Sequence, residues 1–452
     1  MIKLENIQRI YFIGIGGIGM SALARYFSFH GKKVSGYDRT ETVLTKTLVK
    51  EGIDVNYEDQ VALAPKDADL IVYTPAIPAN HAQLNYYRNN NYEVVKRSDV
   101  LGAITERSFN ICIAGTHGKT TISTMVAHIL RHTGYGCNAF LGGIAANYNS
   151  NFWSSENNTC VIEADEYDRS FLKLNPDIAV ITAMDADHLD IYGTEKNMQD
   201  TFIEFSTKIK SGGTLFLKEG IAREKEFNAP VLKKYSMKDE SATIHPHNIR
   251  MMNGYYLFDV KVGNETVEEV ALNMGGLHNV ENASVAISIA KQLKIDNEKI
   301  KDAVEDFKGV KRRFEYIVKK KKLVYIDDYA HHPEELSTLI KSAKALFEGL
   351  KCTVIFQPHL FTRTRDLATE FAKSLDIADE VILLPIYPAR ELPIEGVSSE
   401  LIKSQMSNKN VRIIEKKDVL KNIRDNQLLI TAGAGDIDTL VDPIKQLLSS
   451  TI

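Results

Sequence analysis

The sequence predicts an α/β protein of three domains whose sheets are largely parallel. At 452 residues the chain exceeds the size of one hydrophobic core, since a domain usually holds about 100 to 200 residues. Short apolar runs alternate with helical patterns through most of the chain, which favours parallel sheets. A strand followed by a glycine turn and a helix occurs twice, and each occurrence indicates the start of a separate nucleotide-binding unit.

The expected strands are short apolar runs, at residues 10–13, 70–73, 110–114, 179–183, 324–326, 354–356, 381–384 and 428–431. The second glycine turn indicates a domain boundary near Ser108, and the polar segment 307–312 indicates another near residue 312. Turn residues and short alternating runs between about 221 and 274 predict an antiparallel addition to the middle domain. We expect the basic run 319–322 to be a solvated turn.

Composition and charge exclude several classes of function. The net charge is −4, so the chain lacks the basic field on which nucleic-acid binding depends. No apolar run approaches the roughly 20 residues that cross a bilayer, and the first residues do not resemble a signal peptide. The four cysteines form no C-x-x-C pair. We therefore expect a cytoplasmic protein with no nucleic-acid partner and no membrane insertion; the sequence does not indicate its oligomeric state.

The first glycine loop, Gly14-x-Gly16-x-x-Gly19, lies between the strand 10–13 and a helix expected at 20–29. Asp38 ends a second strand about twenty residues further on, as in dinucleotide-binding units. Glycines at this spacing let backbone N–H groups approach a pyrophosphate at the helix N-terminus. The pattern favours a diphosphate ligand over a purely structural turn, but it does not separate NAD from a UDP-sugar.

The second glycine loop follows the buried-type strand 110–114 and ends in Gly118-Lys119-Thr120. Lys119 can neutralise β- and γ-phosphate charge, and the Thr120 hydroxyl can reach Mg²⁺. The loop is shorter than a Walker A motif, because Ile113 stands where the first glycine would be. Its strand, loop and helix context nevertheless predicts ATP as the ligand.

Two acidic clusters follow expected strands, Glu163-Ala-Asp-Glu166 and Asp185-Ala-Asp-His-Leu-Asp190. Ligand sites collect at the carboxyl ends of parallel strands, so these groups can converge on the magnesium ion of ATP. The alternative is that the carboxylates only cap turns and helices.

These motifs together resemble the Mur ligase family, which also includes folylpolyglutamate synthetase. Within the family, the closest resemblance is to the branch that joins L-alanine to UDP-N-acetylmuramate. It extends over all three expected domains and rests on Gly115-Thr-His-Gly-Lys-Thr-Thr121, Glu163-Ala-Asp-Glu166, Asp187-His188-x-Asp190, His278-Asn279-x-x-Asn282, Arg312-Arg-Phe-Glu-Tyr316, Asp327-Asp-Tyr-Ala-His-His-Pro333, Phe356-Gln-Pro-His-Leu-Phe-Thr-Arg363-Thr-Arg-Asp366, the Gly14 loop and Tyr73-Thr-Pro-Ala-Ile77.

The resemblance implies a Rossmann-like N-terminal domain (1–107), a central phosphate-loop ATPase domain with a mostly parallel sheet (108–312) and a Rossmann-like C-terminal domain (313–452). It assigns the UDP-sugar, in place of NAD, to Gly14, Gly16, Gly17, Gly19, Asp38, Thr74 and Ala76. It assigns ATP to Gly115, Thr116, His117, Gly118, Lys119, Thr120, Thr121, His278, Asn279, Asn282, Arg313 and Asp328. The implied ligands of Mg²⁺ are Thr120, Glu163 and His188.

The third domain is implied to bind L-alanine through Tyr329, His331, His359 and Arg363. Pro333 disfavours a helical conformation at His332, so we expect the loop before it to be extended and to face a cleft. An arginine suits a bidentate contact with a carboxylate. Many relatives carry arginine where this chain has Leu360, which changes part of the implied carboxylate site.

The implied reaction passes the γ-phosphoryl group of ATP to the muramyl carboxylate, and the amine of alanine attacks the resulting acyl phosphate. The expected catalytic residues are Lys119, His188, Arg313, Asp328 and His331, and either histidine can serve as the base for the amine. One alternative is a related ligase with another amino acid or peptide, or with folate. The other is a nucleotide-binding regulator without chemistry, which the reactive residues in several domains disfavour.

Overall fold

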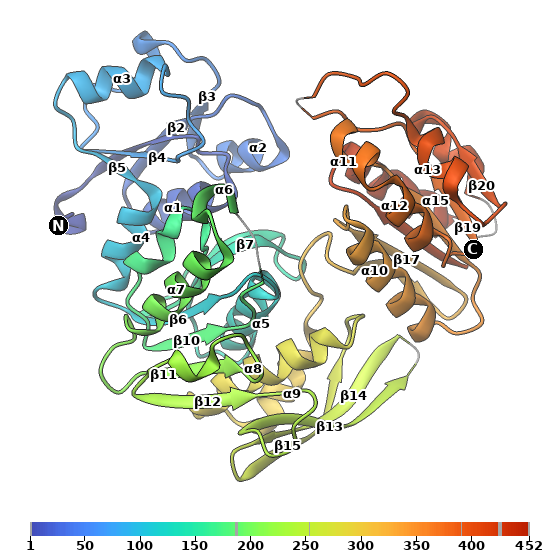
Figure 1. The fold of residues 1–452 in the computed structure, drawn as a ribbon. Coiled ribbons are helices and arrows are strands. Elements are labelled where there is room, and N and C mark those ends of the chain that lie inside the picture. The colour runs from blue at the N-terminus through green and yellow to red at the C-terminus, as the bar shows by residue number, and fades with distance from the viewer. Residues whose placement is uncertain (1, 186–188, 253, 390, 424–426, 451–452) are drawn as a thin grey trace.

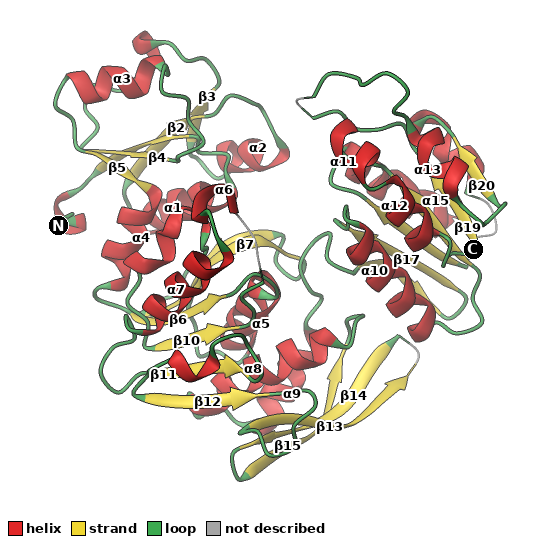
Figure 2. Ribbon diagram, in the orientation of Figure 1, coloured by secondary structure: helices red, strands yellow, loops and turns green. Residues whose placement is uncertain are grey.

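The structure, a computed structural model, describes residues 2–185, 189–252, 254–389, 391–423 and 427–450. It is an α/β protein of three domains with mostly parallel sheets, as the sequence predicts (Figures 1 and 2). Over these residues, every helix is too short or too polar to cross a bilayer. The exact limits 1–107, 108–312 and 313–452 stay a prediction.

The first domain is a five-stranded parallel sheet in the order β3-β2-β1-β4-β5. Its strands are β1 Arg9–Ile13, β2 Lys33–Tyr37, β3 Asp54–Asn56, β4 Leu70–Tyr73 and β5 Val94–Lys96. Its α-helices are α1 Ile18–Phe29, α2 Val43–Lys50, α3 Ala82–Asn89 and α4 Arg97–Thr105. The chain order reverses at β1, and ligands of such sheets bind at this point, outside the carboxyl ends of the strands.

The middle domain has ten strands in the order β15-β14-β13-β12-β11-β10-β6-β9-β7-β8. They are β6 Phe109–Ala114, β7 Asn138–Ala145, β8 Ser150–Trp153, β9 Thr159–Glu163, β10 Ile178–Ile181, β11 Thr214–Lys218, β12 Val231–Tyr235, β13 Ile244–Met252, β14 Tyr255–Val262 and β15 Glu265–Leu272. The helices are α5 Lys119–His132, α6 Leu189–Tyr192, α7 Glu195–Ser206, α8 His278–Gln292 and α9 Asn297–Asp306. The expected antiparallel addition is the ribbon β13–β15, whereas β12 is parallel to both of its neighbours.

The third domain is a six-stranded sheet in the order β16-β17-β21-β18-β19-β20, parallel except for β16. Its strands are β16 Glu315–Lys320, β17 Leu323–Asp328, β18 Cys352–Phe356, β19 Glu380–Leu383, β20 Val411–Ile413 and β21 Leu428–Ala432. Its helices are α10 Pro333–Leu346, α11 Phe361–Asp366, α12 Ala368–Leu375, α13 Ser399–Gln405, α14 Val419–Asn422 and α15 Val441–Ser450. Helix α10 begins at Pro333 after an extended His332 (φ −112°, ψ 152°), as predicted.

The first domain packs closely on the middle domain. Apolar residues of both form one buried cluster, in which the ring of Tyr26 lies 5.4 Å from that of Phe140. Lys96 and Arg97 of the first domain pair with Asp168 and Asp165 of the middle domain, at 3.3 and 3.8 Å. These contacts give the first two domains a shared core.

The third domain stands to the right of the other two in Figure 1 and meets the β13–β15 ribbon of the middle domain. The Tyr316 hydroxyl and Lys319 Nζ both donate to the carbonyl of Gly254, at 3.0 and 2.9 Å. The predicted solvated turn lies at Lys321 and Lys322, whereas Lys319 is exposed but belongs to β16 and contacts the middle domain. This side chain links two domains, and partial burial lowers its pKa.

Candidate functional site

The second glycine loop is held tightly against the strand next to β6. Gly115 and Gly118 have φ of +128° and +79°, which L side chains rarely adopt. A Cβ on Gly115 would lie 2.0 Å from the hydroxyl oxygen of Thr182. That hydroxyl donates to the carbonyl of His117, and Thr116 N donates to the carbonyl of Ala183 at 3.0 Å. The loop thus places the N-terminus of α5 at the carboxyl ends of the parallel strands, where backbone N–H groups can bind phosphate.

Lys119 is paired inside the protein. Its Nζ donates to the carbonyl of Gly115 at 2.6 Å and to Glu166 Oε1 at 2.8 Å. The side chain of Glu166 is 1% exposed, and burial raises the pKa of this carboxyl while Lys119 opposes that rise. The sequence groups Glu166 with the carboxylates that can converge on Mg²⁺, but does not predict its pairing with Lys119. Its position three residues after the end of β9 was the available signal.

Thr120 and Glu163 lie together, as predicted. Thr120 Oγ1 donates to Glu163 Oε1 at 2.9 Å, and Gly142 N donates to Glu163 Oε2 at the same distance. A Cβ on Gly142 would lie 2.4 Å from the carboxylate, so only glycine leaves this approach open. A hydroxyl and a carboxylate are the oxygen ligands that Mg²⁺ prefers, so these residues suit the implied ion. His188, the third implied ligand, lies outside the described residues.

Helix α8 brings its two predicted asparagines to the loop. A Cβ on Gly118 would lie 3.1 Å from Asn282 Oδ1, while Asn282 Nδ2 donates to Asn279 Oδ1 at 3.0 Å. His278 begins the same helix, and burial lowers its pKa.

Arg313 and Asp328, the predicted nucleotide contacts of the third domain, lie on either side of β16. Asp328 accepts from Phe314 N at 2.6 Å and from Ala330 N at 2.7 Å, and burial raises its pKa to about 6. Arg313 is exposed. Neither makes a hydrogen bond or ion pair with residues 115–121 in the described part of the chain.

The first glycine loop is shaped by its own strand neighbours. Gly14 N and Ile15 N both donate to the carbonyl of Tyr37, at 2.8 and 3.0 Å, and Gly14 has φ +89°. Asp38 Oδ2 accepts from Gly16 N at 2.7 Å. Asp38 therefore supports the loop itself, since one of its oxygens is occupied by the backbone.

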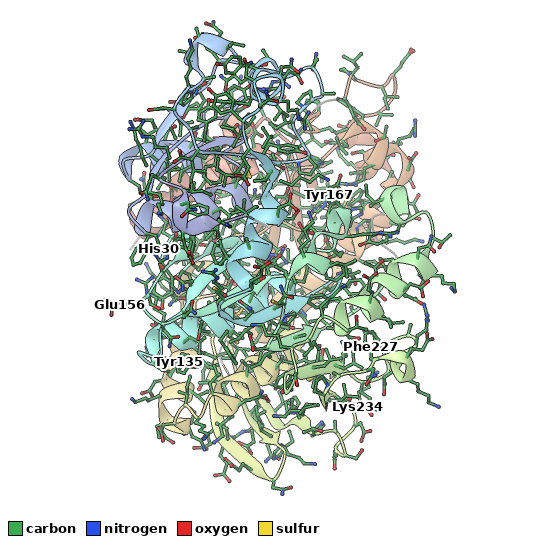
Figure 3. All side chains as sticks on the ribbon, turned by 90° about the vertical axis from the view of Figure 1, so that its left-hand side faces the viewer. His30, Tyr135, Glu156, Tyr167, Phe227 and Lys234 are labelled. Carbon is green, nitrogen blue, oxygen red and sulfur yellow. The ribbon has the colours of Figure 1, made fainter. Side chains whose placement is uncertain are left out.

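A cavity of 430 Å³ lies where the first domain meets the middle domain. Of the predicted sugar-nucleotide residues, it is lined by Gly17, Gly19, Thr74 and Ala76. Glu163 of the middle domain lines the same cavity, as does Tyr167, which Figure 3 labels at the junction of the two domains. One pocket thus joins the first glycine loop to the carboxylate beside the second.

Arg97 is a site residue that the sequence analysis missed. It lines the cavity, and a Cβ on Gly19 would lie 2.9 Å from its Nη1. A single arginine after a short strand belongs to no motif, so only the fold reveals that it supplies positive charge beside the first loop.

The third domain gathers its four predicted amino-acid residues at the carboxyl ends of β17 and β18. The rings of His331 and His359 lie 6.4 Å apart, Tyr329 lies 5.2 Å from His331, and Arg363 Nη1 lies 3.5 Å from His359 Nδ1. Leu360, at the departure from the family pattern, has φ +72° and precedes α11.

Three further residues that the sequence analysis did not single out support this cluster. Glu335 accepts from the backbone N–H groups of His331 and His332, at 2.9 and 3.0 Å. Glu391 accepts from Thr362 N at 3.0 Å, and the ring of Tyr387 stacks on that of His359 at 5.8 Å.

Comparison with known families gives three matches in the order of the three domains. The model of the Mur ligase family catalytic domain matches residues 9–109, that of the Mur ligase middle domain matches residues 113–290, and that of the Mur ligase glutamate ligase domain matches residues 312–435.

Individual relatives match over the whole chain. The UDP-N-acetylmuramate–L-alanine ligase of Flavobacterium johnsoniae is 46% identical, over 100% of both chains. That of Porphyromonas gingivalis is 46% identical, over 98% of this chain and 100% of its own. The crystal structure of the UDP-N-acetylmuramate-alanine ligase MurC of Thermotoga maritima is 28% identical, with a TM-score of 0.83 over 98% of this chain and 100% of its own. A murein peptide ligase of Psychrobacter arcticus shares the fold at 22% identity and a TM-score of 0.68.

Proposed function

We infer the function of this chain from the family to which it belongs, the Mur ligase family. The chain is an ATP-dependent ligase that joins L-alanine to the carboxylate of UDP-N-acetylmuramate in peptidoglycan biosynthesis, giving ADP and phosphate. The observation that carries this function is the cavity shared by the first glycine loop and Glu163, because it brings a sugar-nucleotide site beside the phosphate loop. The full-length identity to curated ligases of this kind supports the choice of substrates.

A carboxylate is a poor electrophile, and transfer of the γ-phosphoryl group turns it into an acyl phosphate. Both reactants of that step are anionic, so catalysis depends on neutralising charge and on positioning. Lys119 supplies a positive charge at the phosphates when its ammonium leaves Glu166 and contacts ATP. Gly115–Thr121 binds the phosphate chain through backbone N–H groups, and Arg97 supplies charge on the side of the sugar nucleotide.

Mg²⁺ would be held by Thr120 and Glu163, with His188 as the further ligand implied by the family resemblance. When bound, the ion would neutralise phosphate charge. The oxygen ligands and the glycine that leaves room beside Glu163 support this choice. We also propose that the enzyme works in the cytoplasm.

The amino-acid residues lie on the third domain, so the proposed reaction needs that domain to close on the other two. Gly309, with φ +84° in the segment between α9 and β16, is the proposed hinge. Ser108, at the boundary expected between the first two domains, is buried and donates to Asn110 Oδ1 at 2.7 Å, which supports a fixed junction there. Closure would also exclude water from the acyl phosphate.

Two experiments test these proposals. Phosphate release from ATP should require UDP-N-acetylmuramate and be fastest with L-alanine, whereas faster turnover with glycine, L-serine or a tripeptide would overturn the substrate. The tripeptide matters because a murein peptide ligase shares this fold. Small-angle scattering should show compaction when UDP-N-acetylmuramate and a non-hydrolysable ATP analogue bind together. An unchanged radius of gyration, with binding confirmed independently, would contradict closure.

A further inference from the structure

The two histidines of the third-domain cluster face one another but are held in different ways. Their ring centroids are 6.4 Å apart and their planes are inclined by 74°. In each ring Nδ1 is engaged by the protein, and Nε2 has no hydrogen-bond partner among the described residues. Because the partner of the engaged nitrogen decides where the ring carries its hydrogen, the two rings can be assigned separately.

His331 Nδ1 faces two hydrogen-bond acceptors. It lies 2.9 Å from the carbonyl oxygen of Tyr329 and 3.4 Å from Glu335 Oε2. Neither of these oxygens can donate when Glu335 is ionised, so Nδ1 must carry the hydrogen of the neutral ring. His331 Nε2 then holds a lone pair and can accept a proton.

His359 Nδ1 faces a donor instead. It lies 3.5 Å from Arg363 Nη1, and a guanidinium cannot accept a hydrogen bond. His359 Nδ1 is therefore the acceptor, and Nε2 carries the hydrogen. Burial and the charge of Arg363 lower the pKa of His359, which keeps this ring neutral. The stacked ring of Tyr387 fixes its plane, at an interplanar angle of 15°.

One side of the cluster therefore offers hydrogen-bond donors, and the other side offers an acceptor. His359 and Arg363 present N–H groups, and the side chain of His331 presents a lone pair across the ring separation of 6.4 Å. A free α-amino acid has the complementary pattern, since its carboxylate accepts and its ammonium donates.

We propose that His331 is the base that removes a proton from the ammonium of the bound amino acid, and that Glu335 is a positioning residue for His331. His359 and Arg363 then hold the carboxylate, as the family resemblance already implies. The proposal rests on the ligase function proposed above and identifies a base that the sequence left undecided between His188 and His331.

His331 Nε2 takes one proton from the ammonium and becomes an imidazolium. The neutral amine attacks the carbonyl carbon of the acyl phosphate, and the C–N bond forms as the C–O bond to phosphate breaks. The remaining extra proton on nitrogen leaves with the phosphate as hydrogen phosphate, and His331 returns its proton to solvent.

Glu335 places a carboxylate beside His331 Nδ1. The titratable groups in contact with the ring are Tyr329, His332, Glu335 and His359.

The test compares His331→Gln with His332→Asn, a neighbouring histidine at the N-cap of α10, using two nucleophiles. With L-alanine at neutral pH, His331→Gln should lose about 100-fold or more in amide formation, in the range of lost general-base catalysis. With hydroxylamine, which needs no deprotonation, it should form the hydroxamate within a few-fold of wild type. The alanine defect should shrink as pH rises. His332→Asn should resemble wild type in both assays.

Equal losses with the two nucleophiles, or an alanine defect that is constant with pH, would overturn the role of His331. If wild type forms neither amide nor hydroxamate from UDP-N-acetylmuramate and ATP, the proposed function itself fails. His359→Ala should raise KM for L-alanine about tenfold without changing hydroxamate formation, as for a lost charge-assisted contact; an unchanged KM would remove His359 from the carboxylate site.

Glu335→Gln provides a separate readout of positioning. Glutamine can still accept the backbone N–H groups but removes the negative charge beside His331. If Glu335 positions His331, kcat with L-alanine should fall while hydroxamate formation stays near that of wild type. An equal loss with both nucleophiles would show that Glu335 has only a structural role.

Discussion

The two glycine loops have the same backbone plan and different sources of charge. Each follows a buried parallel strand and begins a helix, α1 in the first domain and α5 in the middle domain. The second loop contains its own cation, Lys119, paired with the buried Glu166. The first contains none, and its positive charge comes from Arg97 on α4.

The comparison shows that a glycine motif specifies the backbone conformation of the loop but not the ligand that it binds. The glycines let the backbone approach a phosphate in both loops, but the ligand is selected by side chains that the motif does not contain. In the first loop, Asp38 binds the backbone at Gly16 N rather than standing free for a ribose. A loop of dinucleotide-binding pattern can thus serve another diphosphate.

The largest expected effect comes from removing the cation of the second loop. Lys119→Met should lower phosphate release about 100- to 1000-fold, the range seen when one electrostatic contact to a transition state is lost. Glu166 would then be buried without its partner and would hold a proton. Lys208→Met, an exposed lysine on the middle domain, is the control. A turnover near that of wild type would mean that Lys119 does not serve the phosphates.

The glycines themselves should differ in their tolerance of alanine. Gly115→Ala forces a side chain into φ +128° and against Thr182, so it should lower the free energy of unfolding by about 3 kcal/mol or more. Gly17→Ala in the first loop has ordinary φ, and its nearest neighbour is the Gly14 carbonyl at 3.4 Å, so the loss should stay below about 1 kcal/mol. Urea unfolding measures both. Similar losses would show that the second loop is not the more constrained.

Removing the distant cation of the first loop should affect only one substrate. Arg97→Met should raise KM for UDP-N-acetylmuramate about 10- to 100-fold, because a charge-assisted contact is lost, and leave KM for ATP unchanged. Asp165→Asn breaks the same ion pair from the other side and keeps the arginine, so it separates binding from domain packing. An equal rise in KM for both substrates would contradict the proposal that Arg97 acts on UDP-N-acetylmuramate and not on ATP.

The smallest expected effect is a dependence of stability on pH at Glu166. Burial raises the pKa of this carboxyl above its usual 4.5, so above that pH the folded protein holds a proton that the unfolded chain has released. The free energy of unfolding gains nothing from Glu166 at lower pH, and it falls as pH rises above 4.5. Glu166→Gln should remove a slope of at most about 1.4 kcal/mol per pH unit. Urea titrations at several pH values measure it, and an unchanged slope would assign the effect to other groups.

The sequence was sufficient for the elements whose signal is local. The strands at β1, β4, β6, β10, β17, β18, β19 and β21 appear as predicted, because short apolar runs bounded by turns allow few other structures. Thr120 beside Glu163 was also predictable, since both follow parallel strands of one sheet. Arg97 and Tyr387 were not, because each acts on a residue brought near only by the fold. The contact of Lys319 with Gly254 was not predictable either, since the two lie far apart in the chain. Glu335, in contrast, bonds to His331 and His332, which are only four and three residues away.

The proposed function has the two loops act on one phosphoryl transfer, and a single isotopic measurement tests this. UDP-N-acetylmuramate labelled with oxygen-18 in its carboxylate is incubated with the enzyme, ATP and L-alanine, and the released phosphate is analysed by mass spectrometry. An acyl phosphate requires one carboxylate oxygen to leave with the phosphate, so each phosphate released should carry the label in proportion to its enrichment. Unlabelled phosphate accompanied by amide product would contradict transfer between the ligands of the two loops.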